Sequence, residues 1–255
     1  MGKIIAIANQ KGGVGKTTTS TNLAACLAER GKSVLLIDSD PQGNATSGAG
    51  TDRSEVKNTI YDLYLGESPA SECITGSAVE NLKVIPSEPN LAGAEIDLIG
   101  VEDREFILRN ALRDLRDDYD FMIIDCPPSL NILTVNALTA ADSVIVPIQC
   151  EYYALEGLSQ LIYTIDLIKQ RLNSGLEIEG VVFTMYDSRT NLSLEVVENV
   201  KENIDQKVYK TIIPRNVRLA EAPSYGLPIN LYDGKSTGAA AYRQLAEEVI
   251  SSDVM

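Results

Sequence analysis

The stretch from Gln10 to Thr17, with the sequence Gln-Lys-Gly-Gly-Val-Gly-Lys-Thr, combines a glycine-rich turn with two lysines and a hydroxyl. The backbone N–H groups of such a turn can surround phosphate oxygens, while Lys16 reaches the β- and γ-phosphates and Thr17 offers a ligand to Mg²⁺. An ordinary phosphate loop has glycine at the place of Gln10 and gives no role to Lys11. The motif therefore predicts phosphate binding assisted by an additional cation.

Acidic residues follow two apolar runs and could complete this site. Val34–Ile37 is followed by Asp38 and Asp40, and Phe121–Ile124 is followed by Asp125. An acid at the end of a strand can also serve only as a cap for the next turn. Three such acids beside a phosphate loop favour metal binding. Asp125 would hold Mg²⁺, and Asp38 and Asp40 would contact the outer shell of the metal and the attacking water.

The elements predicted around these residues alternate between strands and helices. The apolar run Lys3–Ala8 and the periodic segment Thr18–Arg30 place a strand before the glycine-rich loop and a helix after it. Further strands are predicted at Val34–Asp38, Leu82–Pro86, Phe121–Asp125, Ser143–Ile148, Ile178–Thr184 and Val208–Ile213. Further helices are predicted at Glu102–Arg116, Ile132–Ala141, Leu155–Leu172, Leu192–Asn203 and Gly238–Ile250, with Thr46–Pro69 as loop and short helices over the site. This pattern predicts an α/β fold in one domain over residues 1–255, with a doubly wound, mostly parallel sheet flanked by helices on both faces.

The amino-acid composition of the chain excludes several classes of functional site. The chain has no histidine, which excludes a Ser-His-Asp triad and a histidine-ligated zinc site. The four cysteines are widely spaced, so we expect them to be structural. A net charge of −14 argues against a surface coated in basic residues but leaves local basic patches open. No apolar run reaches the roughly 18 residues of a membrane span and no signal peptide fits before the first strand, so we expect a cytoplasmic protein.

The chain resembles the ParA/Soj branch of the ParA/MinD family of deviant Walker A ATPases over essentially its whole length. The residues that carry the resemblance are Lys11–Thr18, Asp38–Asn44, Ile124–Pro128, Gln149–Gly157 and Ile213–Ser224. The resemblance implies a P-loop NTPase fold, ATP or ADP with Mg²⁺ as cofactors, and slow ATP hydrolysis.

The resemblance also assigns roles within the site. In this family two ATP-bound subunits meet face to face, and the lysine at the position of Lys11 contacts phosphate in the partner's site. Gly12 would lie where the subunits nearly touch, so that a side chain there blocks pairing but spares nucleotide binding. Asp40 would orient the attacking water, and Asp38 would belong to the switch around Mg²⁺. The implied phosphate and metal contacts are Lys11, Gly12, Gly13, Val14, Gly15, Lys16, Thr17 and Thr18, with Thr17, Asp38 and Asp125 at the metal.

For the base, the Asn-Lys-x-Asp string that reads guanine is absent, which favours adenine. The resemblance implies adenine contacts at Met185, Pro214, Asn216 and Val217.

Basic residues gather in the C-terminal part of the chain. The segment from Lys201 to Arg218 has a net charge of +3, and Arg189 lies shortly before it. A run of this size is often only a solvated face. In the family, however, the ATP-bound dimer binds double-stranded DNA without sequence preference through basic residues of this part. The implied DNA contacts are Arg189, Lys201, Lys207, Lys210, Arg215 and Arg218.

The resemblance therefore implies a chromosome- or plasmid-partitioning ATPase, associated with the nucleoid and stimulated by a ParB-type partner. A MinD-like, membrane-associated division-site ATPase is the alternative, but the C-terminal segment Ala246–Met255 is short and acidic, so no membrane binding is expected. An ATP-dependent carrier of a metal cluster would need paired cysteines, and Cys126 has no second cysteine in a matching context.

Overall fold

The apolar runs of the sequence form the strands of a mostly parallel sheet in the computed structural model, which describes residues 2–151 and 154–253. Tyr152 and Tyr153 of one family motif, and the last two residues of the acidic tail, lie outside the described residues. The strands are β1 (Lys3–Ile7), β2 (Val34–Asp38), β3 (Thr75–Gly76), β4 (Leu82–Ile85), β5 (Phe121–Asp125), β6 (Ser143–Gln149), β7 (Glu177–Tyr186) and β8 (Val208–Pro214). Within the described residues they form one sheet in the order β3-β4-β2-β5-β1-β6-β7-β8. All neighbours are parallel except β3 and β4, so the predicted fold class is confirmed.

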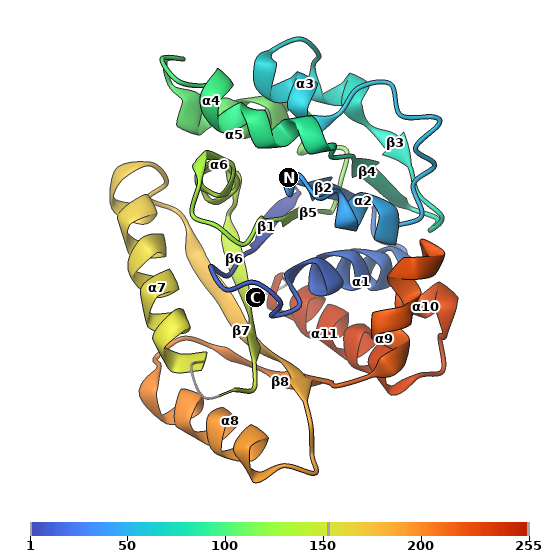
Figure 1. The fold of residues 1–255 in the computed structure, drawn as a ribbon, viewed down its shortest axis with the longest axis vertical. Helices are drawn as coiled ribbons and strands as arrows, with labels where there is room; N and C mark the ends of the chain where they lie inside the picture. Colours follow the sequence, from blue (N-terminus) through green and yellow to red (C-terminus); the bar gives the residue numbers. More distant parts are fainter. Residues whose placement is uncertain (1, 152–153, 254–255) are drawn as a thin grey trace.

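Helices cover both faces of this sheet (Figure 1). The α-helices are α1 (Lys16–Glu29), α2 (Asn44–Gly48), α3 (Ile60–Leu65), α4 (Ala94–Asp97), α5 (Ile107–Leu112), α6 (Ile132–Ala140), α7 (Ala154–Arg171), α8 (Asn191–Asn203), α9 (Val217–Glu221), α10 (Ile229–Tyr232) and α11 (Thr237–Asp253). Short 3₁₀ turns are η1 (Ala70–Cys73), η2 (Pro89–Gly93), η3 (Arg104–Phe106), η4 (Arg113–Leu115) and η5 (Ala222–Tyr225). None of the described helices is long and apolar enough to cross a membrane.

Two hydrophobic cores lie on opposite faces of the sheet, and strand β1 contributes to both. Ile4 and Ala6 pack in the core that includes buried residues of α5, α6, α7 and α8. Ile5 and Ile7 pack in the core that includes buried residues of α1 and α11. Because successive side chains of a strand point to opposite faces, a strand covered on both sides must be apolar at every position. This explains why β1 is a continuous apolar run rather than an alternating one.

The helix predicted at Glu102–Arg116 is shorter than expected, since the α-helical part covers only Ile107–Leu112, with 3₁₀ turns on either side. Asp103 has a φ of 54°, in the left-handed region, which a residue inside a right-handed helix cannot adopt. The helical region therefore cannot begin at Glu102. The segment predicted as loop and short helices at Thr46–Pro69 contains the end of α2 and the whole of α3, and that prediction is confirmed.

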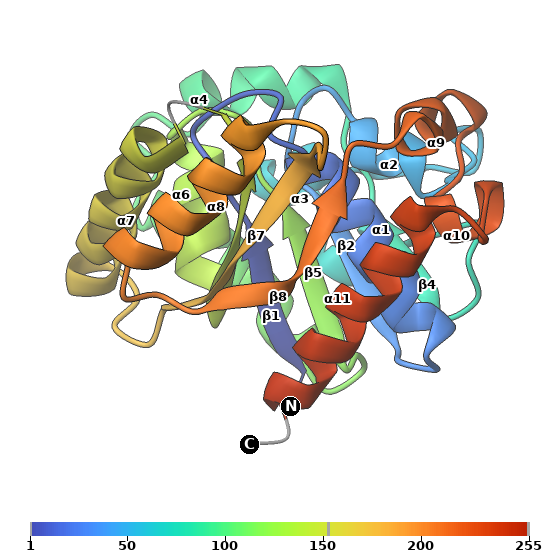
Figure 2. The same ribbon diagram turned by 90° about the horizontal axis from the view of Figure 1, so that it is seen from below.

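The parallel strands bring their carboxyl ends, and the loops that follow, to one edge of the sheet. Figure 2 shows the arrows of β1, β5, β7 and β8 pointing toward the same end of the molecule. At this edge Asp125 of β5 is in register with Ile7 of β1 on one side and with Asp38 of β2 on the other. Ligands of open α/β sheets bind beyond this edge.

Candidate nucleotide site

The glycine-rich loop between β1 and α1 is held in place by its backbone conformation and by Asn9. Gly13 and Gly15 have φ values of 76° and 87°, in the left-handed region that favours glycine. The side chain of Asn9 accepts a hydrogen bond from the backbone N–H of Lys11 at 3.0 Å and donates one to the carbonyl of Pro147 at 2.8 Å. The loop is therefore anchored to the neighbouring strand β6 before any ligand binds.

Gln10, which replaces the first glycine of an ordinary phosphate loop, tethers the loop to α7. Its Nε2 donates a hydrogen bond to Oγ1 of Thr164 at 3.0 Å. On the other side, Oγ1 of Thr184 donates to the carbonyl of Val14 at 2.8 Å. The altered position thus gains a side-chain contact that a glycine could not make.

The two lysines of the loop have different environments. Lys16 is only 6% exposed, and its Nζ donates a hydrogen bond to the carbonyl oxygen of Lys11 at 2.9 Å, within the loop. Burial lowers the pKa of Lys16, while the nearby Asp125 opposes this shift. The side chain of Lys11 is 40% exposed and pairs with Glu151. Lys16 is therefore placed to act inside its own loop, and Lys11 is placed at the surface.

Asp38 and Asp125 form a buried pair of carboxyl groups at the ends of adjacent strands. Both are fully buried. Burial and then the charge of Asp38 raise the pKa of Asp125, and burial also raises the pKa of Asp38. Ser20 of α1 donates to Oδ1 of Asp125 at 2.8 Å. The Thr17 side chain also interacts with the carboxyl group of Asp125 and partly offsets the increase in its pKa.

These residues fit a magnesium ion held jointly with phosphate. Oδ2 of Asp125 is buried and accepts no regular hydrogen bond from the described residues, as expected for an oxygen that has a cation for a partner. Within residues 2–151 and 154–253, no group of three or more Asp, Glu, His or Cys side chains is arranged to hold a metal. Mg²⁺ usually binds through one or two carboxylates together with substrate phosphates and water, rather than in an all-protein cage.

Asp40 lies in the loop that follows β2 and is mostly buried. Its Oδ1 accepts a hydrogen bond from the backbone N–H of Gln42 at 2.9 Å, and its own N–H donates to Oδ1 of Asp38 at 3.2 Å. These bonds orient the carboxylate and link it to the acid pair.

A pocket of about 400 Å³ opens beside the phosphate loop at the ends of β7 and β8. Its lining brings Gly15 and Thr18 together with the four predicted adenine contacts, Met185, Pro214, Asn216 and Val217. Val217 is 72% exposed, so its apolar side chain is accessible from this pocket. The side chain of Asn216 is already engaged, since its Oδ1 caps α9 and its Nδ2 donates to Thr237. The four adenine contacts stay a prediction. The side chain of Asn216 is the least free of the four to bind adenine, because it already makes these hydrogen bonds.

The structure divides the predicted DNA contacts between two ends of the sheet. Arg189 follows β7, and Arg215 and Arg218 follow β8, so these three lie at the carboxyl edge with the phosphate loop. Lys207 precedes β8, and Lys201 lies in the last turn of α8, toward the amino edge. The seven residues of β8 span roughly 20 Å. The predicted DNA contacts therefore lie toward both edges of the sheet within a single subunit.

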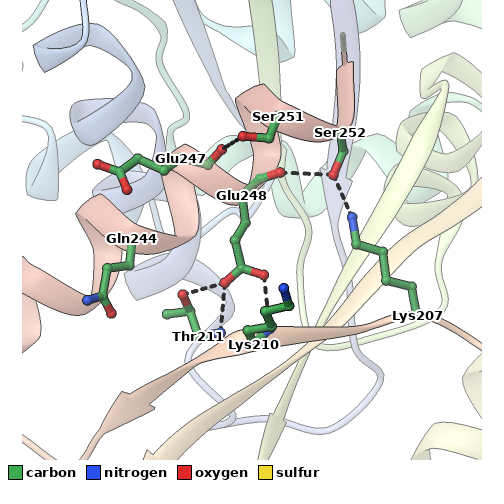
Figure 3. Close-up of a pocket in the computed structure, with 8 residues that line it drawn as sticks. All are labelled: Lys207, Lys210, Thr211, Gln244, Glu247, Glu248, Ser251 and Ser252. Carbon is green, nitrogen blue, oxygen red and sulfur yellow. Dashed lines mark hydrogen bonds between the residues drawn. The ribbon is translucent and has the colours of Figure 1, made fainter. Parts of the chain in front are cut away.

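Lys207 and Lys210 are instead associated with α11, around an open pocket of about 590 Å³ (Figure 3). Nζ of Lys207 donates to Oγ of Ser252 at 2.6 Å. The carboxylate of Glu248 accepts from the N–H groups of Lys210 and Thr211 at 2.9 and 2.8 Å. Acidic side chains of α11 therefore share this surface with the two lysines.

The arginines at the carboxyl edge also have acidic neighbours. Arg189 makes three hydrogen bonds to Asp187, two from its guanidinium and one from its backbone N–H, and they hold the pKa of Asp187 well below its usual range. Arg218 pairs with Glu221 at 2.9 Å and with Asp233 at 3.5 Å. Exposed ion pairs of this kind are weak, so a phosphate could replace the carboxylates.

Several residues around the site were not predicted from the sequence. Glu151 pairs with Lys11, Ser20 contacts Asp125, and Thr46 and Ser87 contact the two acids that follow β2. Glu151 lies in a family motif, which is the one sequence signal that pointed to it. Ser20 lies one helical turn after Lys16, but nothing in the sequence indicated what it contacts.

Comparison with known proteins agrees with this geometry. A family model described as an AAA domain matches residues 2–178. The chain is 59% identical over 252 residues to the sporulation initiation inhibitor protein Soj of Bacillus subtilis, covering 99% of this chain and 100% of that protein. It is 54% identical over 253 residues to the chromosome partitioning protein ParA of Myxococcus xanthus, covering 99% of this chain and 89% of that protein.

Among solved structures, a cobyrinic acid a,c-diamide synthase from Mycobacterium smegmatis with bound ADP and magnesium is 39% identical. It superposes with a TM-score of 0.87, covering 100% of this chain and 96% of that one.

Proposed function

Because the chain belongs to the ParA/Soj family of chromosome-partitioning ATPases, we propose that its ATP-bound form is a dimer that holds DNA without sequence preference and releases it after hydrolysis. The observation that carries this proposal is the surface formed by Lys11 and Gly12. Lys11 is more exposed than Lys16, and among the described residues a Cβ placed on Gly12 would come within 4 Å of the Cβ of Pro128 alone, at 3.9 Å.

Among the described residues, no close contact therefore excludes a Cβ at position 12, whose φ also lies outside the left-handed region. A requirement for glycine there would come from a second molecule. In the proposed dimer, Lys11 leaves Glu151 and contacts phosphate bound by the other subunit. A cation supplied in this way offsets the repulsion between two nucleotide-bearing surfaces and stabilises charge at the transferred phosphoryl group.

Within one subunit, we infer that Lys16 and the loop N–H groups bind the phosphates of ATP. Thr17 and Asp125 would hold Mg²⁺, with Asp38 in its outer shell, and the metal would supply neutralisation of phosphate charge. Asp40 would orient the attacking water through the oxygen that Gln42 leaves available. The pocket beside Met185 and Pro214 would take the base.

The DNA-binding surface that we propose is centred on the arginines at the carboxyl edge, Arg189, Arg215 and Arg218, because they share this edge with Lys11 and Gly12. A two-fold axis through that face would double the number of phosphates neutralised. Binding would then depend strongly on salt and on the dimer. Lys201, Lys207 and Lys210 would add to the contact only if the DNA also reaches the amino edge of the sheet.

The same family membership supports a ParB-type partner, which would stimulate hydrolysis, and a location in the cytoplasm on the nucleoid. The acidic character of the chain, with a net charge of −14, suits a basic partner segment.

The proposal is tested by measuring DNA binding across a salt series with ADP, ATP and a non-hydrolysable ATP analogue. We expect binding with ATP and the analogue, little with ADP, and a steep loss as salt rises. Equal binding with ADP and ATP would contradict a nucleotide-controlled dimer, and binding that ignores salt would contradict a phosphate-directed surface.

A pair of double variants then locates the surface. Arg189→Glu with Arg218→Glu should abolish the gel shift while ATP-driven dimerisation persists. Lys207→Glu with Lys210→Glu reverses the same number of charges at the other end of β8 and should weaken binding far less. A gel shift of the arginine variant equal to that of the wild type would refute the proposed location.

A further inference from the structure

The loop that carries Asp40 is closed at its base by a hydrogen-bonded contact between Asp38 and Thr46. Asp38 ends β2 and Thr46 lies in α2, so the two residues stand on either side of the loop. Oδ2 of Asp38 accepts hydrogen bonds from both the backbone N–H and the hydroxyl of Thr46, each at 2.7 Å. Both residues are almost completely buried. Hydrogen bonds to a carboxylate are about twice as strong as neutral ones, so this closure fixes the ends of the loop firmly.

Ser87, which follows strand β4, braces the same loop from the side. Its backbone N–H donates to Oγ1 of Thr46 at 3.0 Å, and its hydroxyl donates to the carbonyl oxygen of Asp40 at 2.7 Å. The Thr46 hydroxyl donates its one proton to Asp38 and accepts from the N–H of Ser87, so the hydroxyls of Thr46 and Ser87 both have partners. A fully satisfied buried network holds its members rigidly.

The side chains of Thr46 and Ser87 thus link the two acids that lie at and just after the end of β2. The geometry points to Thr46 and Ser87 as positioning residues for ATP hydrolysis, which hold the backbone of Asp40 so that its carboxylate faces the site. This inference rests on the proposed role of Asp40 in orienting the attacking water.

The orientation of Asp40 matters because one carboxylate oxygen is already engaged. Oδ1 accepts from the N–H of Gln42, and no hydrogen bond from the described residues to Oδ2 is seen. A water molecule can be oriented by Oδ2 only if the loop holds that oxygen at hydrogen-bond distance from it. Misplacement of a reacting group by about 1 Å costs on the order of 100-fold in rate.

The test compares Thr46→Val, Thr46→Ser and Ser87→Ala with the wild type in single-turnover ATP hydrolysis at saturating Mg²⁺. Valine keeps the shape of threonine but removes the hydroxyl, so we expect the hydrolysis rate to fall about 10- to 100-fold. The dissociation constant for ATP should change less than about threefold, since the hydrogen bonds of the Thr46 side chain join it to Asp38 and Ser87 and not to the phosphate loop. Serine restores the hydroxyl and should restore most of the rate. Ser87→Ala loses the bond to Asp40 but keeps the N–H, and should give an intermediate loss.

Thr51→Val is the matched control. Thr51 is also a buried threonine close to α2, but its hydroxyl has no hydrogen-bond partner among the described residues. Its replacement should leave the rate unchanged. Thermal melting of each variant separates loss of the fold from loss of the rate, and Ser87→Ala decides the question if Thr46→Val does not fold.

Asp40→Ala is measured in parallel to separate this inference from the proposed function. If Asp40→Ala loses turnover while folded Thr46→Val and Ser87→Ala hydrolyse ATP within twofold of the wild type, the positioning role is wrong and the role of Asp40 stands. If Asp40→Ala turns over at the wild-type rate, both are wrong. A Thr46→Ser variant as slow as Thr46→Val would show that side-chain volume matters rather than the hydroxyl, which also overturns the inference.

Discussion

Replacing Gly12 distinguishes a glycine required by a partner from one required by its own loop. In the structure, a Cβ at this position meets its nearest heavy atom, the Cβ of Pro128, at 3.9 Å, an ordinary van der Waals distance. The backbone there is not left-handed. The cost to the single subunit is therefore within about 0.5 kcal/mol, as for an ordinary surface substitution. For a domain of this size, that corresponds to a change in melting temperature of about 2 °C or less.

Gly13→Ala is the contrasting variant. A Cβ there also meets nothing within 4 Å, but the φ of Gly13 is 76°, which an alanine adopts at a cost. Left-handed backbone costs roughly 1–2 kcal/mol for an L-residue, so the melting temperature should fall by about 2–8 °C. The two neighbouring glycines thus differ in why they are needed, although the space around each is open.

The assay combines thermal melting, ATP titration and sedimentation with a non-hydrolysable ATP analogue. We expect Gly12→Ala to melt like the wild type and to bind ATP with unchanged affinity, yet to remain monomeric when the analogue is present. Two results would refute the reasoning. A Gly12→Ala protein that forms the dimer as readily as the wild type would show that this position does not lie at the contact. A Gly12→Ala protein that melts as low as Gly13→Ala would show that its own loop needs the glycine.

Further variants test the individual site residues. Lys16→Ala should abolish turnover and weaken ATP binding by at least tenfold in a fluorescent-nucleotide titration, because the buried ammonium of Lys16 lies within the loop. Unchanged turnover would exclude Lys16 from phosphate binding. Asp125→Asn should raise the melting temperature of the nucleotide-free protein and abolish its further rise with Mg²⁺ and ATP. Because the pKa of Asp125 is raised in the folded state, ionisation of its carboxyl group destabilises the fold at high pH. The increase in melting temperature given by asparagine should therefore shrink as the pH falls and the wild-type carboxyl group is protonated. An increase in melting temperature that grows on acidification would contradict the raised pKa. Met185→Ala should weaken ATP binding several-fold without changing the affinity for inorganic triphosphate, and an equal loss for both ligands would remove Met185 from the base pocket.

Much of the fold followed from the sequence because the signals are local. The strand β1, the loop and the helix α1 appear as an apolar run, a cluster of glycines and a helical period in about 30 residues. The helix predicted at Glu102–Arg116 was wrong at its start because a single residue, Asp103, adopts a conformation that helical periodicity does not reveal. The short helices α9 and α10 were missed because neither is long enough to show a period.

The residues of the candidate site also fall into those that the sequence predicted and those that it did not. Lys16, Thr17 and the acids at the strand ends were found because their spacing is that of a motif. Ser87 could not be found, since it is 41 positions from Thr46 in the chain and meets it only because β2 and β4 are neighbours in the sheet. The basic residues were grouped by sequence, and the direction of β8 separates them, because a strand carries residues at its two ends to opposite edges of the sheet.

The sequence by itself determined which chemical groups are available to this protein: a glycine-rich loop with two lysines, acids at the ends of apolar runs, and no histidine. Tertiary structure alone decided which of these groups act together. It placed Lys16 inside the loop and Lys11 on the surface, set Asp38 beside Asp125, and tied Asp40 to a distant serine. The physical reason is that spacing along the chain fixes only contacts within one element. The register of parallel strands and the burial of the polar groups between them depend on how the whole sheet is assembled.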